Sequence, residues 1–297
     1  MSAASLLLPD FLLIALGVVL ARARWFDASF WGSIERLVYF VLFPALLFRS
    51  LATSPLSPAD ALRLAGVGVA FTVTGMLLSA AGRLVLSLPD STFAACFQCC
   101  FRFNTYVALA IAARLPDPRA VALIGLLIGI LVPIVNVAAV AALARRGARR
   151  MLPELARNPL VLACATGIAW NALHAPMPAV VVRVLELTGS AAVPLGLLAV
   201  GAGLRFEKYT LPWPAIAWWN FVKLIALPAT AFLLAPLAGL SPLERQVAVL
   251  MAAVPTATSA YILATRMHAP GAPVALLIST GTLMAAFTLP LWLSLVT

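Results

Sequence analysis

The chain has 297 residues, of which 63% are hydrophobic and only 10% are charged. Soluble domains average about 45–50% apolar and about 25% charged residues. An ordinary soluble fold is excluded, because it could not keep this many apolar side chains away from water. The formal net charge of +10 does not make nucleic acid the expected partner, because the basic residues are spread over short segments between apolar runs. The expected partner of a chain with this many apolar residues is the lipid bilayer.

Ten apolar segments predict membrane-spanning helices, since a helix needs about 20 residues to cross about 30 Å of hydrocarbon. In chain order they cover residues 5–21, 34–51, 61–84, 91–114, 119–143, 159–173, 180–204, 214–237, 243–267 and 273–296. A basic stretch at 145–157 separates the fifth segment from the sixth. We therefore predict an all-α integral membrane protein with a first five-helix repeat at 1–143, a basic linker at 144–158 and a second five-helix repeat at 159–297.

Lysine and arginine are unevenly divided between alternate loops. One set of loops holds Arg22, Arg24, Arg83, Arg145, Arg146, Arg149, Arg150, Arg157, Arg205, Lys208 and Arg266, and the other holds Arg63, Arg114, Arg119, Arg183 and Arg245. The set that is richer in basic residues is expected to face the cytoplasm. This predicts a multi-pass protein of the inner membrane whose termini are both periplasmic and whose central linker is cytoplasmic.

An odd number of spans in each half turns the second half upside down relative to the first. This inverted-repeat plan is common among secondary transporters. Weak internal similarity supports it, because FPALL at 43–47 resembles VPLGL at 193–197, and residues 106–115 resemble residues 258–267.

Two cations lie far from the ends of their predicted helices. Arg102 is near the middle of 91–114, and Lys223 is near the middle of 214–237. A charge at such a depth costs about 2.5–3.5 kcal/mol on insertion scales, and no acidic residue is expected at a matching depth. We therefore predict that Arg102 and Lys223 bind an anion. The alternative is that both cations bond backbone carbonyls at a helix break and only stabilise the fold.

The most polar stretches inside the predicted membrane lie at equivalent places in the two halves. The first contains Asn104 and Thr105, and the second contains Pro255, Thr256 and Thr258. Pro255 lacks an N–H, so its helix is expected to break there, and the ends of broken helices attract anions. Two broken helices that cross at mid-membrane would form a substrate site between the repeats. The alternative is that these small and hydroxyl residues only join neighbouring helices.

Cysteine and histidine do not form a metal or catalytic pattern. Cys96, Cys99 and Cys100 lie in an apolar segment without a histidine or acidic residue nearby in the sequence. Close helix packing therefore explains them better than metal or redox chemistry. His174 and His268 are expected at helix ends, and no nucleophile–base pair is visible. We expect no enzyme activity, no catalytic residue, no metal and no cofactor.

Four short motifs carry a resemblance to a known family. They are FRFNTY at 101–106, RNPL at 157–160, FVKLIALP at 221–228 and AAVPTATSAY at 252–261. In this order they resemble the bacterial branch of the auxin efflux carrier family, and the resemblance covers the whole chain. It implies two inverted repeats in which the first, second, sixth and seventh helices form a scaffold. The other helices form a mobile transport domain in which the fourth and ninth cross.

The resemblance also implies the substrate class and the position of the site. Substrates of the family are organic anions, which are auxin in plants and malonate or similar carboxylates in bacteria. Carried over to this sequence, the crossing lies at Asn104 and Thr105 in one helix and at Pro255 and Thr256 in the other. The plant pattern has a proline at both crossings, whereas this chain has none between residues 90 and 116. The first break must therefore depend on Asn104 and its neighbours.

The predicted function is a carrier that moves small mono- or dicarboxylates across the inner membrane by elevator-type alternating access. The alternative is a sodium- or proton-coupled symporter or antiporter of a related inverted-repeat fold, whose ion site needs oxygen ligands and commonly a carboxylate. The sequence leaves open the identity of the carboxylate, the direction of transport and the oligomeric state, for which a homodimer is one alternative.

Overall fold

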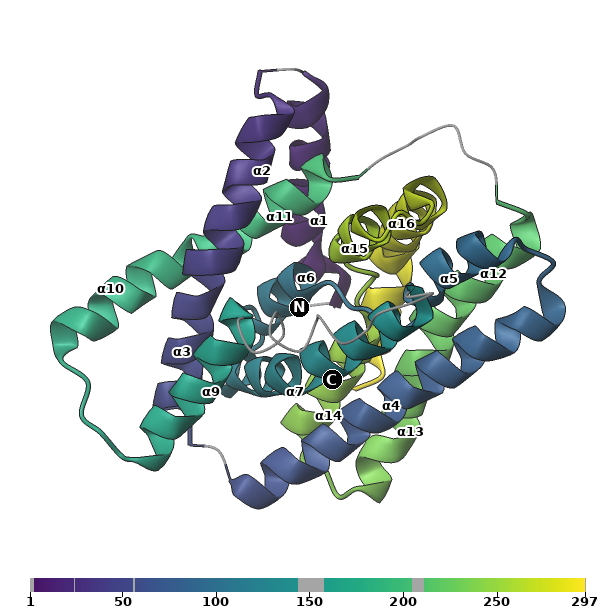
Figure 1. Cartoon of the computed structure of the whole chain (residues 1–297). Coiled ribbons are helices and arrows are strands. Elements are labelled where there is room, and N and C mark those ends of the chain that lie inside the picture. Colours follow the sequence, from purple (N-terminus) through teal and green to yellow (C-terminus); the bar gives the residue numbers. More distant parts are fainter. Residues whose placement is uncertain (1–2, 24, 56, 144–157, 205–210, 297) are drawn as a thin grey trace.

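The computed structural model describes residues 3–23, 25–55, 57–143, 158–204 and 211–296, and all regular structure in these ranges is helical (Figure 1). The first half contains α1 (Ala3–Arg22), α2 (Ala28–Leu37), the π-helical turn η1 (Val38–Leu42), α3 (Phe43–Thr53), α4 (Pro58–Val85), α5 (Asp90–Phe97), α6 (Thr105–Ala112) and α7 (Arg119–Leu143). The second half contains α9 (Pro159–Ala172), α10 (Ala179–Ser190), α11 (Ala192–Ala202), α12 (Trp213–Phe221), the π-helical turn η3 (Val222–Ala226), α13 (Leu227–Leu237), α14 (Pro242–Ala253), α15 (Ser259–Arg266) and α16 (Gly271–Ser294). The predicted linker lies outside the described residues, apart from Asn158.

Each of the ten predicted segments coincides with one helix or with consecutive helices of the structure. Six helical segments are long and apolar enough to cross a bilayer, and they cover residues 28–53, 58–85, 119–143, 179–202, 213–237 and 271–294. The four other predicted spans, formed by α1, by α9 and by the pairs α5/α6 and α14/α15, are not among these six. The protein is therefore an all-helical, multi-pass membrane protein, while its ten-span inverted repeat stays a prediction.

The second predicted segment begins earlier than its apolar run suggested. The helix starts at Ala28 instead of near residue 34, because the Asp27 side chain accepts a hydrogen bond of 2.8 Å from the backbone N–H of Phe30. Such an N-cap satisfies a donor that the first helical turn leaves without a partner. The start of this helix is set by a polar cap and not by the hydrophobic pattern.

Both π-helical turns lie next to a proline. η1 precedes Pro44, and η3 precedes Pro228. Proline has no N–H to donate to the carbonyl four residues earlier. Where this hydrogen bond is missing, the helix widens into a π-helical turn. In η3 the carbonyl of Leu224 is satisfied by the indole N–H of Trp292 at 2.9 Å. Since η3 also carries Lys223, the widened turn helps to set where this cation lies.

The helices pack in two groups that share α7 (Figure 1). In one group α1 runs along α11, and α3 runs along α9 and α10. The crossing of α1 and α11 depends on Gly17 and Gly201, because a Cβ added at either position would collide with the backbone carbonyl of Leu198 or Ile14, respectively. Small residues at such crossings let membrane helices approach closely. In the other group α13 packs against α4 and α14, and α16 packs against α14 and α15.

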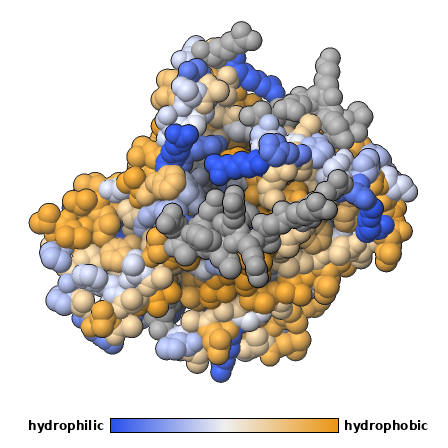
Figure 2. All heavy atoms as spheres, viewed as in Figure 1, coloured by the Kyte–Doolittle hydropathy of each residue, from blue (hydrophilic) through white to orange (hydrophobic). Residues whose placement is uncertain are grey.

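The outer surface is strongly apolar. Leu84, Leu237 and Phe287 are each more than 80% exposed. Figure 2 shows apolar residues over broad parts of both flanks, with hydrophilic residues gathered in the upper centre of the face in view. Exposed apolar surface of this extent marks an interaction surface, and the apolar composition of the helices identifies the bilayer as its partner.

Candidate functional site

The two interrupted helices meet at their breaks. Between α5 and α6 the chain leaves the helix, and between α14 and α15 it does so again around Pro255, which confirms the predicted break there. The backbone N–H of Asn104 donates to the carbonyl of Pro255 at 2.8 Å. In return, the hydroxyl of Thr256 donates to the carbonyl of Cys99 at 2.6 Å. Each break therefore satisfies a backbone group of the other, which explains how irregular chain is accommodated inside an apolar bundle.

The first break has no proline and is built from amide side chains. Asn104 is the N-cap of α6, and its Oδ1 accepts from the backbone N–H groups of Tyr106 at 3.1 Å and Val107 at 3.3 Å. Gln98 lies at the other end of the break and donates from Nε2 to the carbonyl of Ala260, across in α15, at 3.1 Å. An asparagine cap is a strong signal for starting a helix, so Asn104 begins α6 where the sequence offers no proline.

Arg102 lies in this break, and its side chain is held by neutral partners. The residue is only 6% exposed. Nη1 donates to the hydroxyl of Ser259 at 2.9 Å, and Nη2 donates to Oδ1 of Asn136 at 2.6 Å. Nε is buried without a hydrogen-bond partner. None of the ion pairs found among the described residues includes Arg102, so its charge has no acidic side chain beside it there.

Lys223 has a different hydrogen-bond partner from Arg102. Its Nζ donates to the carbonyl of Ala252 at 2.9 Å, and the residue is 2% exposed. Ala252 is in the last turn of α14, where carbonyls lose their helical N–H partners. A cation at a helix C-terminus also interacts favourably with the helix dipole. Lys223 therefore bonds a backbone carbonyl at a helix break, and it bonds a different group from Arg102. Its part in binding an anion stays a prediction.

The two remaining predicted residues lie beside the breaks without a side-chain bond to them. Thr105 is the first residue of α6 and is half-buried. Thr258 precedes α15 and lines a small cavity of about 110 Å³, together with Glu35, Gly203, Tyr261, Ile262, Ala275 and Ile278. The cavity is much smaller than the ~300–1,000 Å³ of pockets for drug-sized ligands, so it suits only a small solute. It lies between the α1/α11 group, which supplies Gly203, and the group that contains α15 and α16.

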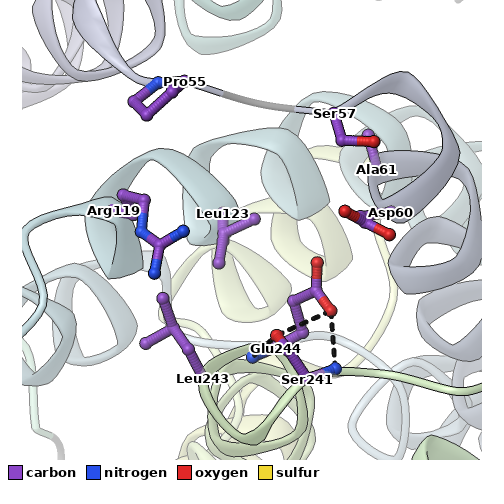
Figure 3. A pocket seen from close by; sticks show the side chains of 9 residues that line it. All are labelled: Pro55, Ser57, Asp60, Ala61, Arg119, Leu123, Ser241, Leu243 and Glu244. Carbon is purple, nitrogen blue, oxygen red and sulfur yellow. Dashed lines mark hydrogen bonds between the residues drawn. The ribbon is translucent and has the colours of Figure 1, made fainter.

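A larger cavity of about 210 Å³ lies where α4, α7 and α14 begin, and none of the predicted site residues lines it. Figure 3 shows Arg119 on one side of it and the carboxylates of Asp60 and Glu244 on the other. The Glu244 carboxylate accepts from the backbone N–H and the hydroxyl of Ser241, both at 2.8 Å, and thereby caps α14. Two carboxylates beside one arginine make this cavity unfavourable for an anion, so the breaks are the better candidate.

Three side chains that bond at the two breaks were not singled out in the sequence. Asn136 and Gln98 are polar residues within apolar helical runs, a signal that marks costly and often functional positions in membranes. Ser259 stands in the polar stretch after Pro255 but is not distinguished there from its hydroxyl neighbours. Only the structure shows that Asn136 and Ser259 converge on Arg102.

The cysteines lie in the interior, and the two histidines lie just beyond helix ends. Cys96, Cys99, Cys100 and Cys164 are free and buried. No group of three metal-ligating side chains occurs within the part of the chain that the structure describes. His174 and His268 follow α9 and α15 with φ values of 49° and 55°. A residue in this left-handed conformation commonly ends a helix.

Comparison with known proteins gives two matches. A family described as "Membrane transport protein" matches residues 120–293. A protein of Rhizobium meliloti (strain 1021) with the name "Putative malonate transporter" is 25% identical over 275 residues, which cover 87% of this chain and 84% of that protein.

Proposed function

This chain belongs to the auxin efflux carrier family of membrane transport proteins, and from that premise we propose that it is a secondary transporter of small organic anions. The substrate class is mono- or dicarboxylates, and the name of the Rhizobium meliloti relative makes malonate the first compound to test. The proposed site comprises Arg102, Asn104 and Thr105 at the first break and Pro255, Thr256 and Thr258 at the second. In this proposal the protein is a carrier and not an enzyme.

The observation that carries this proposal is the environment of Arg102. A buried guanidinium without an acidic partner is costly, and both hydrogen-bond acceptors found for it are neutral. A carboxylate can supply the missing charge and can bind the guanidinium through two parallel N–H donors. The N-terminus of α6, which begins next to Arg102, adds a favourable dipole for the same anion.

The packing supports elevator-type movement. The proposed scaffold is the group of α1, α2, α3, α9, α10 and α11, and the proposed mobile domain is the group that carries both breaks. The small cavity lies between these groups and reaches Thr258 next to the second break. Its lining includes Gly203 just after α11 and Ala275 in the first turns of α16. The distribution of basic residues assigns the adjoining loops to the cytoplasmic face of the inner membrane. With this orientation both termini are periplasmic.

Substitution of Arg102 tests the proposal. Arg102→Lys keeps the charge but loses the planar fork, so the affinity for malonate should fall by about tenfold or more, since a charge-assisted hydrogen bond contributes about 1.5–3 kcal/mol. Arg102→Ala should abolish measurable binding. Isothermal calorimetry of the purified protein, beside a melting curve of each variant, separates lost binding from lost folding.

Arg183→Ala is the matched control. This arginine is largely exposed on α10 and pairs with Glu186 at 3.1 Å, and such exposed pairs contribute little. The control should bind malonate as the unmodified protein does. A folded Arg102→Ala protein with unchanged affinity would remove Arg102 from the site.

A further inference from the structure

We infer that Asn136 is a positioning residue, which fixes the guanidinium of Arg102 through a neutral oxygen and thereby leaves its positive charge available to the transported anion. This inference rests on the proposed function, and it adds a residue of α7 to a site that is otherwise formed by the two breaks.

The geometry identifies Asn136 as one of two anchors of the guanidinium. Its Oδ1 is 2.6 Å from Nη2 of Arg102, at the short end of the range for hydrogen bonds from a charged donor. The hydroxyl of Ser259 accepts from Nη1 at 2.9 Å. The two acceptors come from α7 and α15, so the plane of the guanidinium is held from two helices.

This arrangement leaves part of the donor capacity of the guanidinium unused. A guanidinium has five N–H donors in a fixed plane. Asn136 and Ser259 each engage a terminal nitrogen, whereas Nε is buried and has no hydrogen-bond partner. In any guanidinium, Nε–H and one N–H of the neighbouring terminal nitrogen lie on the same edge, and a carboxylate can bind such a pair through both oxygens.

A comparison with Arg114 shows what a neutral anchor changes. Nε of Arg114 is 2.7 Å from Oδ1 of Asp10, whose side chain is 2% exposed. That arginine is paired with a carboxylate within the protein and has no unmatched charge to offer. Arg102 is bonded by an amide oxygen and a hydroxyl, whereas Arg114 is bonded by a carboxylate, so the hydrogen bonds of Arg102 orient the group without neutralising it.

A purely structural role would favour the opposite choice at position 136. Aspartate has almost the same size as asparagine and would give the buried cation a counter-charge, which lowers the cost of burying it. If the bond only held α7 to the first break, a carboxylate would serve at least as well. The neutral amide is the better choice where the counter-charge has to come from a ligand.

The test is the substitution Asn136→Asp, measured by calorimetric titration with malonate and by a melting curve of the full-length protein. We expect the affinity for malonate to fall at least tenfold, because the new carboxylate competes for Arg102. The melting temperature should be equal or higher. Asn136→Ala should also weaken binding, but with a lower melting temperature. This split between affinity and stability is not expected from a merely structural residue.

Asn158→Asp is the matched control. Asn158 is also buried, and its Oδ1 caps α9 by accepting from the backbone N–H groups of Leu160 and Val161. Aspartate caps a helix as well as asparagine does, so this variant adds a buried carboxylate without contacting Arg102. Its affinity for malonate should be unchanged.

Two results would overturn the inference while leaving the proposed function intact. One is an Asn136→Asp protein that binds malonate with the affinity of the unmodified protein. The other, decisive if that variant does not fold, is unchanged affinity in Asn136→Ala. If the unmodified protein binds neither malonate nor any other mono- or dicarboxylate in the same assay, the proposed function itself has failed and the inference falls with it.

Discussion

The two helix breaks lie against each other, yet different side chains stabilise them. The first, between α5 and α6, is closed by amides, since Asn104 caps α6 and Gln98 reaches across to α15. The second, between α14 and α15, follows from Pro255, and Lys223 supplies the donor for the carbonyl of Ala252. Backbone groups that lack helical partners are therefore bonded by neutral amide side chains at the first break and by a charged ammonium group at the second.

The two buried cations differ in the same way in what they bond. Lys223 bonds the carbonyl end of a helix, where a positive charge is stabilised by the backbone itself. Arg102 bonds only neutral side chains in the described part of the chain, and one of its N–H groups has no partner. The function of a buried cation in a membrane protein can therefore be inferred only when its hydrogen-bond partners are known. In the sequence, a cation that bonds a helix end cannot be distinguished from one that has an N–H group without a partner.

The largest effect is expected for Asn104→Leu. Leucine cannot accept from the N–H groups of Tyr106 and Val107, and loss of such a cap costs about 0.5–2 kcal/mol. Because this cap forms the first break, malonate uptake into proteoliposomes should be lost while the protein is still expressed and purified.

Asn158→Leu is the control for that variant, because it removes a comparable cap from α9, away from the breaks. It should lower the melting temperature by a similar amount and leave uptake measurable. Equal loss of uptake in both variants would mean that the break at Asn104 has no special role.

A smaller loss of function, with a clear loss of stability, is expected for Lys223→Met. The carbonyl of Ala252 would lose its side-chain donor, and an unsatisfied buried polar group costs about 1–3 kcal/mol. The melting temperature should fall, while the affinity for malonate should change less than in Arg102→Ala. The opposite pattern, lost binding at an unchanged melting temperature, would mean that Lys223 binds the anion and is not needed for stability.

The smallest effect is expected for Thr256→Val, which removes the hydroxyl bond to Cys99 across the two breaks at nearly constant volume. Loss of one such bond costs about 0.5–1.5 kcal/mol, so thermal unfolding should show a modest decrease in stability. Thr230→Val is the comparison, because its hydroxyl bonds the Ala226 carbonyl within the same helical segment. If Thr230→Val slows uptake as much as Thr256→Val does, the bond between the breaks does not contribute to transport.

Several features followed from the sequence alone because they depend on local chemistry. Long apolar runs predicted where the helices lie, and Pro255 predicted a break because proline cannot donate a helical hydrogen bond. Because no proline lies near Asn104, the sequence predicted that the first break depends on this asparagine and its neighbours, and the structure confirms it. Such a prediction is possible because an asparagine cap starts a helix through hydrogen bonds to residues at most three positions away.

The partners of the buried charges were decided only by the tertiary structure. Arg102 is 34 residues from Asn136 and 157 residues from Ser259, and Lys223 is 29 residues from Ala252. No local pattern connects positions so far apart, and helix packing alone brings them within hydrogen-bond distance. The sequence could therefore identify two costly cations, but it could not tell which one a backbone carbonyl engages and which one is held by neutral side chains, because that depends on which helices face each other.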